Sequence, residues 1–99
     1  MEAYEGYYIV RSYEAGVFFT QLGEHDKANK LIELKNCRKV HYWDGAAAVE
    51  QMAMEGVKFP ERCRITVEVP SMIVSNPIQI IPCTREAVES LRLVSVWKR

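Results

Sequence analysis

The stretch HYWDGAAA, residues 41–48, decides the predicted fold, because the chain changes there from a strand pattern to a helix pattern. Side chains alternate between the two faces of a strand, so Tyr42 shares a side with Val40 and is predicted to enter the core. Trp43 is then predicted to lie at the rim, free for a ligand or a subunit. Asp44 suits the N-cap of a helix, since its carboxylate can accept backbone N–H groups of the first turn.

The helix expected after this stretch spans residues 46–55 and is amphipathic. Gly56 is a natural stop, because glycine tolerates the left-handed conformation that often follows a helix. Met54 and Ala47 fall on the otherwise polar side of this helix, where a partner helix would fit as well as a partial cover from the same chain.

Strands are predicted on both sides of the helix, from segments that are β-branched, aromatic or alternating. They cover residues 7–11, 17–22, 31–34, 38–43, 63–69, 72–74, 78–81 and 94–97, with a kink at residues 35–36, a polar hairpin loop at 23–30 and a turn at 75–77. Pro70 is expected to end the strand before it. A second helix over residues 85–92 is expected to be capped by Thr84.

The resulting order is about β-β-β-α-β-β-α-β. Strand hairpins with two separate helices predict an α+β fold with a mostly antiparallel sheet. A chain of 99 residues predicts a single α+β domain over residues 1–99.

The charge balance narrows the classes of partner. The chain carries 13 basic and 13 acidic residues, and zero net charge argues against a binder of duplex DNA. It also leaves electrostatic repulsion between copies weak, and a core this small gains from association, so a homo-oligomer is expected. No apolar run reaches the ~20 residues that a membrane helix needs, so no membrane contact is expected.

The sequence carries no recognisable catalytic motif. The three cysteines are widely spaced and predict buried free thiols in a reducing cytoplasm. His25 and His41 have no other ligand at helical spacing, which predicts no metal site. No glycine-rich nucleotide cradle or nucleophile elbow is present. We therefore expect no catalytic residues, no cofactor and no enzyme activity.

A binding site is more plausible than a catalytic site. Arginine pairs with phosphate and stacks on bases, tryptophan offers a stacking surface, and small residues at a helix start allow an anion to approach its N–H groups. The candidate ligand-binding residues are Arg11, Arg38, Trp43, Gly45, Ala46, Arg62 and Arg64. The alternative is structural: the aromatic residues lie in the core and at its rim, and the arginines form a solvated sheet face.

The chain also resembles a family of small accessory proteins of tailed bacteriophages, over nearly its whole length. The segments that carry the resemblance are RSYEAGVFFTQL, NCRKVHYWDGAAAVEQMAMEGV, PERCRITVEV and IIPCTREAVESLRLVSVWK, of which the YWDGA…EGV block is the most specific. The resemblance implies a protein of the host bacterial cytoplasm during infection, and it implies no reaction.

Two functions follow from these expectations. The first is a non-catalytic phage accessory protein that evades host defence by sequestering an anionic, nucleotide-derived small molecule. The second is a protein–protein inhibitor of a host enzyme.

Overall fold

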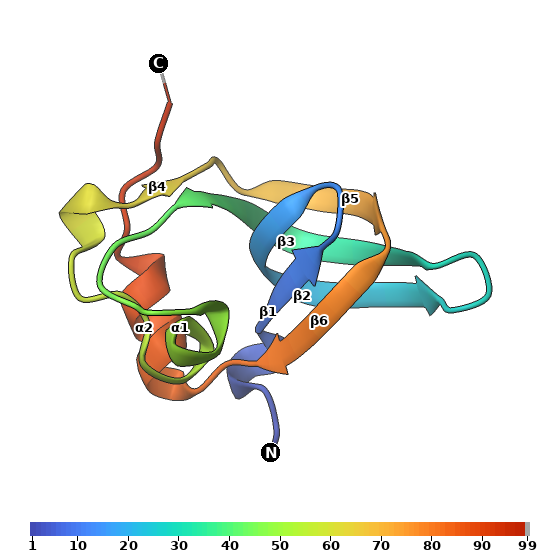
Figure 1. Cartoon of the computed structure of the whole chain (residues 1–99), viewed down its shortest axis with the longest axis horizontal. Helices are drawn as coiled ribbons and strands as arrows, with labels where there is room; N and C mark the ends of the chain where they lie inside the picture. The colour runs from blue at the N-terminus through green and yellow to red at the C-terminus, as the bar shows by residue number, and fades with distance from the viewer. Residues whose placement is uncertain (99) are drawn as a thin grey trace.

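The strands of the protein form a six-stranded, mainly antiparallel sheet, and the computed structural model describes residues 1–98 (Figure 1). The strands are β1 (Tyr8–Ser12), β2 (Gly16–Asp26), β3 (Leu31–Tyr42), β4 (Arg64–Ile65), β5 (Val69–Ser75) and β6 (Pro77–Pro82). The helices are α1 (Val49–Glu55) and α2 (Arg85–Arg92), with short 3₁₀ turns η1 (Tyr4–Gly6) and η2 (Pro60–Arg62). The predicted α+β class is confirmed.

The sheet curls because β5, which pairs with β3, and β6, which pairs with β1, follow one another directly in the chain. Strand β3 pairs with β2 on one side and with both β5 and β4 on the other, while β1 joins β2 to β6. Only Asn76 separates β5 from β6, and its φ of 51° lies in the left-handed region that asparagine tolerates. The backbone N–H of Asn76 donates to Lys30 and its carbonyl accepts from Tyr13, which ties this corner to β1 and β3.

The curl gives the protein two cores, because both faces of the central strands are covered. Ile9 and Val10 are adjacent on β1 and both are fully buried. Ile9 packs with Phe19, Met52 and Leu91 between the sheet and the helices. Val10 packs inside the curl, in the cluster Val10, Phe18, Ile32, Leu34, Cys37 and Val74.

The two helices lie together at one end of the sheet (Figure 1). Thr84 caps α2 as predicted: its hydroxyl oxygen accepts from the Ala87 N–H at 3.1 Å. The same hydroxyl donates to the carbonyl of Met54 at 2.6 Å and so joins the helices. Gly56 ends α1 with a φ of 77°, also as predicted, and a side chain there would collide with Ser90 of α2.

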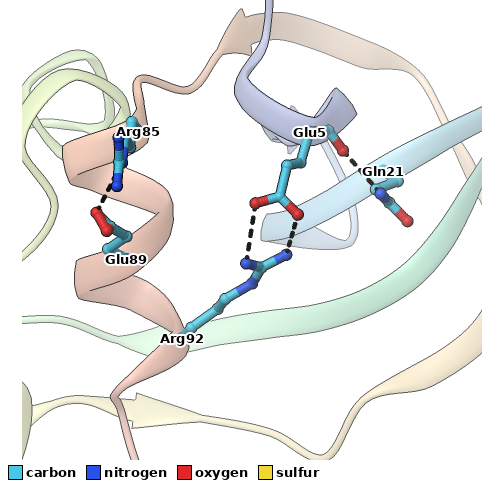
Figure 2. Close-up of polar contacts among 5 residues, drawn as sticks. All are labelled: Glu5, Gln21, Arg85, Glu89 and Arg92. Atoms are coloured by element: carbon cyan, nitrogen blue, oxygen red, sulfur yellow. Dashed lines mark hydrogen bonds and ion pairs between the residues drawn. The ribbon is translucent and has the colours of Figure 1, made fainter.

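An exposed latch holds the N-terminal turn against α2 and the sheet (Figure 2). Both guanidinium Nη atoms of Arg92 donate to the Glu5 carboxylate, each at 3.2 Å. The Gln21 side chain donates to the Glu5 carbonyl at 2.8 Å. On the outer side of α2, Arg85 pairs with Glu89, one helical turn away.

Helix α1 starts later than predicted. It begins at Val49, its N-cap is Ala48, and no side chain caps it there. Asp44 instead lies in the preceding loop, where its carboxylate forms an ion pair with Arg62 at 3.5 Å. The predicted cap at Asp44 and the helix start at residue 46 are therefore wrong. The N–H of Ala47, just before the N-cap, donates to the side-chain oxygen of Gln51 at 2.8 Å.

Three predicted strand boundaries also change. The alternating segment 63–69 is divided between β4 and the first residue of β5, Val69, because Val67 and Glu68 leave the sheet. Strand β5 runs through Pro70, which an edge strand tolerates because one side of its backbone has no strand partner. Segment 94–97 forms a single bridge between Val96 and Ile65. The predicted kink is confirmed at Asn36, whose φ is 49° within the continuous strand β3.

The predicted faces of Tyr42 and Trp43 are reversed. Tyr42 is 52% exposed, whereas Trp43 is half-buried and packs against the core beneath the helices. The reason is a bulge at His41: Val40 pairs with Ile65 and Tyr42 with Arg64, so β3 uses one residue more than β4 over the same step. An extra residue shifts the side-chain alternation, and parity counted from Val40 then fails.

Candidate functional site

The predicted binding residues separate into three places. Arg38 is buried beneath the end of α2, Arg62 lies in η2 and Arg64 in β4, and Arg11 and Trp43 meet in one hollow on the surface. The candidate residues therefore do not form a single site.

Arg38 is a structural residue in this fold. Its guanidinium donates to four backbone carbonyls, those of Thr66 at 2.9 Å, Val94 at 3.0 Å, Ile65 at 3.3 Å and Leu91 at 3.4 Å. Burial lowers the pKa of Arg38, while the charge of Glu68 acts in the opposite direction. These contacts join β3 to β4 and to the C-terminal end of α2, where a cation is favoured.

Arg62 and Arg64 both lie over aromatic rings. The guanidinium carbon of Arg62 is 4.7 Å from the Phe59 ring centre, and that of Arg64 is 5.6 Å from the Trp97 ring centre. Trp97 in turn stacks on His41, with ring centres 4.7 Å apart. These contacts organise an exposed surface.

The hollow that contains Arg11 and Trp43 is the best candidate for a ligand site. Its volume is about 420 Å³, and its lining residues are Arg11, Val17, Trp43, Ala48, Val49 and Glu50. This volume lies within the usual range for small-molecule sites. The hollow lies between the sheet and the start of α1, because Arg11 and Val17 are paired across β1 and β2.

The loop before α1 sets the position of Trp43. The indole Nε1 donates to the carbonyl of Ala46 at 3.2 Å. Gly45 has a φ of 95°, and a Cβ atom there would lie 2.4 Å from the backbone nitrogen of Lys58. Gly45 and Ala46 therefore support the site by shaping the loop. The expected anion contact with their N–H groups at a helix start is not available, since the helix begins at Val49.

The polar groups of the hollow combine one cation with acceptors. Among residues 1–98 the guanidinium of Arg11 has no ion-pair partner. The Glu50 carboxylate accepts from the side-chain amide of Gln79 at 3.2 Å, and Gln79 lies opposite Arg11 in the sheet. The Oε1 atom of Gln79 is buried and has no hydrogen-bond partner within the described chain.

This arrangement suits a flat, anionic ligand. Arg11 can donate two parallel hydrogen bonds to a phosphate or carboxylate, and the indole of Trp43 can stack on a ring. Glu50 can accept from hydroxyl or amino groups. The sequence prediction included Arg11 and Trp43 but missed Glu50 and Gln79. The signal for Gln79 in the sequence was its position as the single polar residue inside the apolar run 78–81.

The side of the first helix on which Met54 and Ala47 were predicted is partly covered by the chain itself. Met54 is half-buried and packs against the core beneath the helices, and its carbonyl accepts from Thr84. Ala47 is exposed, in the loop before the helix. The partial cover from the same chain, one of the two alternatives for this face, is therefore found at Met54, whereas the predicted helical position of Ala47 is wrong.

The three thiols are free, as predicted, and Cys63 is only half-buried. Burial raises the pKa of Cys37 to about 11 and that of Cys83 to about 12, and it also raises the pKa of Cys63. The reactive thiolate is therefore scarce near neutral pH. Within residues 1–98 no group of three or more histidine, cysteine or acidic side chains is arranged to hold a metal ion.

Neither α1 nor α2 is long and apolar enough to cross a membrane, and the same holds for every helix in the described part of the chain.

The chain has no match among curated proteins or among solved structures. Residues 5–91 match the family model described as "Domain of unknown function (DUF6948)". This match extends from the N-terminal turn to the last turn of α2, so the chain belongs to the DUF6948 family.

Proposed function

We propose that this protein binds a small anionic, nucleotide-like ligand in the Arg11–Trp43 hollow and holds it without chemical change. The observation that carries the proposal is the meeting of an arginine that has no ion-pair partner among residues 1–98 with a half-buried indole, in one hollow of about 420 Å³. Arginine supplies the contact to phosphate and the indole supplies the contact to a base.

The proposal assigns the ligand to the nucleotide-derived signals of bacterial defence. The sequence resemblance to phage accessory proteins supports this class of ligand and a site of action in the cytoplasm of the infected host. The raised pKa values of the three thiols support sequestration over nucleophilic catalysis. Glu50, which lines the hollow, suits the hydroxyl and amino groups of a nucleoside.

Calorimetry against a panel of cyclic mono- and dinucleotides and ADP-ribose tests the proposal. We expect at least one compound to bind with a Kd well below 1 mM, about −4 kcal/mol. Arg11→Met should weaken that compound at least about tenfold, a loss of ~1.4 kcal/mol. Arg64→Met is the matched control, because it removes an exposed arginine outside the hollow and should leave the affinity unchanged.

Two outcomes would contradict the proposal. One is the absence of any compound with a Kd below about 1 mM. The other is an equal loss of affinity in Arg11→Met and Arg64→Met. Recovery of a stoichiometric host enzyme with the purified protein, together with no bound small molecule, would instead favour a protein–protein inhibitor.

A further inference from the structure

The β2–β3 hairpin carries charges that take part in no ion pair among residues 1–98. Its outer part, residues 23–33, is here called the hairpin arm, and it extends away from both helices (Figure 1). The strands continue to Asp26 and resume at Leu31, so the predicted loop 23–30 shrinks to a four-residue turn. The three ion pairs formed among residues 1–98 all lie outside this arm.

One side of the arm forms an acidic hollow. Its volume is about 750 Å³, and its lining includes the carboxylates of Glu24, Asp26 and Glu33 together with the apolar side chains of Leu31 and Ile73. Ile73 is 68% exposed, which is unusual for an isoleucine on a strand. The Ser71 hydroxyl donates to Glu33 at 2.9 Å and lowers the pKa of that carboxyl, so Glu33 stays charged.

The adjoining hollow has the opposite charge. Its volume is about 360 Å³, and its lining includes Lys27, Lys30, Pro77 and Ile78, of which Ile78 is 51% exposed. His25 lines both hollows, so the acidic and the basic surface are neighbours on one arm. Each hollow therefore combines an exposed isoleucine with charges of a single sign.

We propose that two copies of this chain pair through their hairpin arms around a two-fold axis near His25. Lys27 and Lys30 of each copy then lie over the acidic hollow of the other, and Ile73 and Ile78 become covered. A two-fold interface requires a self-complementary surface, and adjacent patches of opposite charge meet that requirement. A second copy fits better than a basic or an acidic peptide, because either peptide would satisfy only one of the two hollows.

Charge reversal tests the pairing by native molar mass. The wild-type chain should be a dimer by light scattering at about 100 μM, where a micromolar Kd gives almost complete association. Lys27→Glu with Lys30→Glu should give monomers, because the two new carboxylates of one copy then face the three carboxylates of the other copy's acidic hollow. Glu24→Lys with Glu33→Lys should also give monomers, because Lys27 and Lys30 of one copy then face the two new lysines of the other. Lys58→Glu with Lys98→Glu is the control at two exposed sites outside the arm, and it should remain dimeric.

Mixing the two monomeric variants provides the decisive measurement. In the mixed pair, the natural lysines of one variant meet the natural acidic hollow of the other, and the reversed charges also meet. A heterodimer should therefore form, although each variant alone is monomeric. A circular dichroism spectrum like that of the wild type confirms that each variant is folded. The proposal is overturned by a monomeric wild-type chain at about 100 μM, by dimers in either variant alone, or by no heterodimer on mixing.

Discussion

Arg38 and Arg11 lie on strands of the same sheet, yet Arg38 is buried and Arg11 is exposed. Arg38 is 7% exposed and donates to four backbone carbonyls from β4, α2 and the segment after α2. Arg11 is exposed, has no ion-pair partner among residues 1–98 and borders the candidate ligand hollow. An arginine whose donors are already used stabilises a fold, whereas an arginine with free donors can bind a ligand.

The largest effect is expected from Arg38→Met. This change leaves four carbonyls without their shared donor, and each buried acceptor left unsatisfied costs about 1–3 kcal/mol, so the free energy of unfolding should fall by at least ~3 kcal/mol. Arg11→Met should change it by about 0.5 kcal/mol or less, as is usual for an exposed side chain. Urea denaturation of both variants measures the difference. Equal losses in the two variants would show that Arg38 is not the structural member of the pair.

A smaller effect is expected at the aromatic residue of the hollow. Trp43 is half-buried against the core, so Trp43→Ala should cost about 2 kcal/mol, roughly half the cost of truncating a fully buried aromatic. Tyr42→Ala removes an exposed ring and should cost about 0.5 kcal/mol or less. Chemical denaturation ranks the two variants. A greater loss in Tyr42→Ala would mean that His41 does not shift the strand faces in solution.

The smallest effect, and the only one that depends on pH, is expected at the exposed latch between Glu5 and Arg92 (Figure 2). The hydrogen bond from Arg92 lowers the pKa of Glu5 below its usual value. The latch therefore stabilises the fold at pH values above the ordinary range of a glutamate, about 4.3, and this contribution is lost as the pH falls through the lower pKa of folded Glu5.

Glu5→Gln should therefore lower stability slightly at pH 7 and bring the variant and the wild type together at low pH. Denaturation midpoints measured between pH 7 and pH 2 follow this convergence. Arg92→Met removes the same contact from the other side and should reproduce the pattern. A constant difference between Glu5→Gln and the wild type at all pH values would assign the effect to the backbone of the turn at Glu5, whose φ is 51°, and not to the charge of its side chain.

Local signals in the sequence determined the fold class, most strand positions, both ends of α2 and the C-terminal end of α1. Thr84 caps α2 and Gly56 ends α1 because these roles need only a hydroxyl or a missing Cβ beside the helix. The kink at Asn36 is likewise a backbone preference of a single residue. Such features depend on neighbours within a few positions, and a sequence pattern contains those neighbours.

Only the tertiary structure decided which arginine is buried, which aromatic faces the core and where the ligand hollow lies. Arg38 is buried because the end of α2 and strand β4, more than 25 residues away in sequence, both supply carbonyls to it. Trp43 turns inward because β4 pairs with β3 across a bulge at His41. The hollow itself requires β1, β2 and α1 to meet. These contacts join distant segments, and the free energy that selects them comes from packing the whole chain.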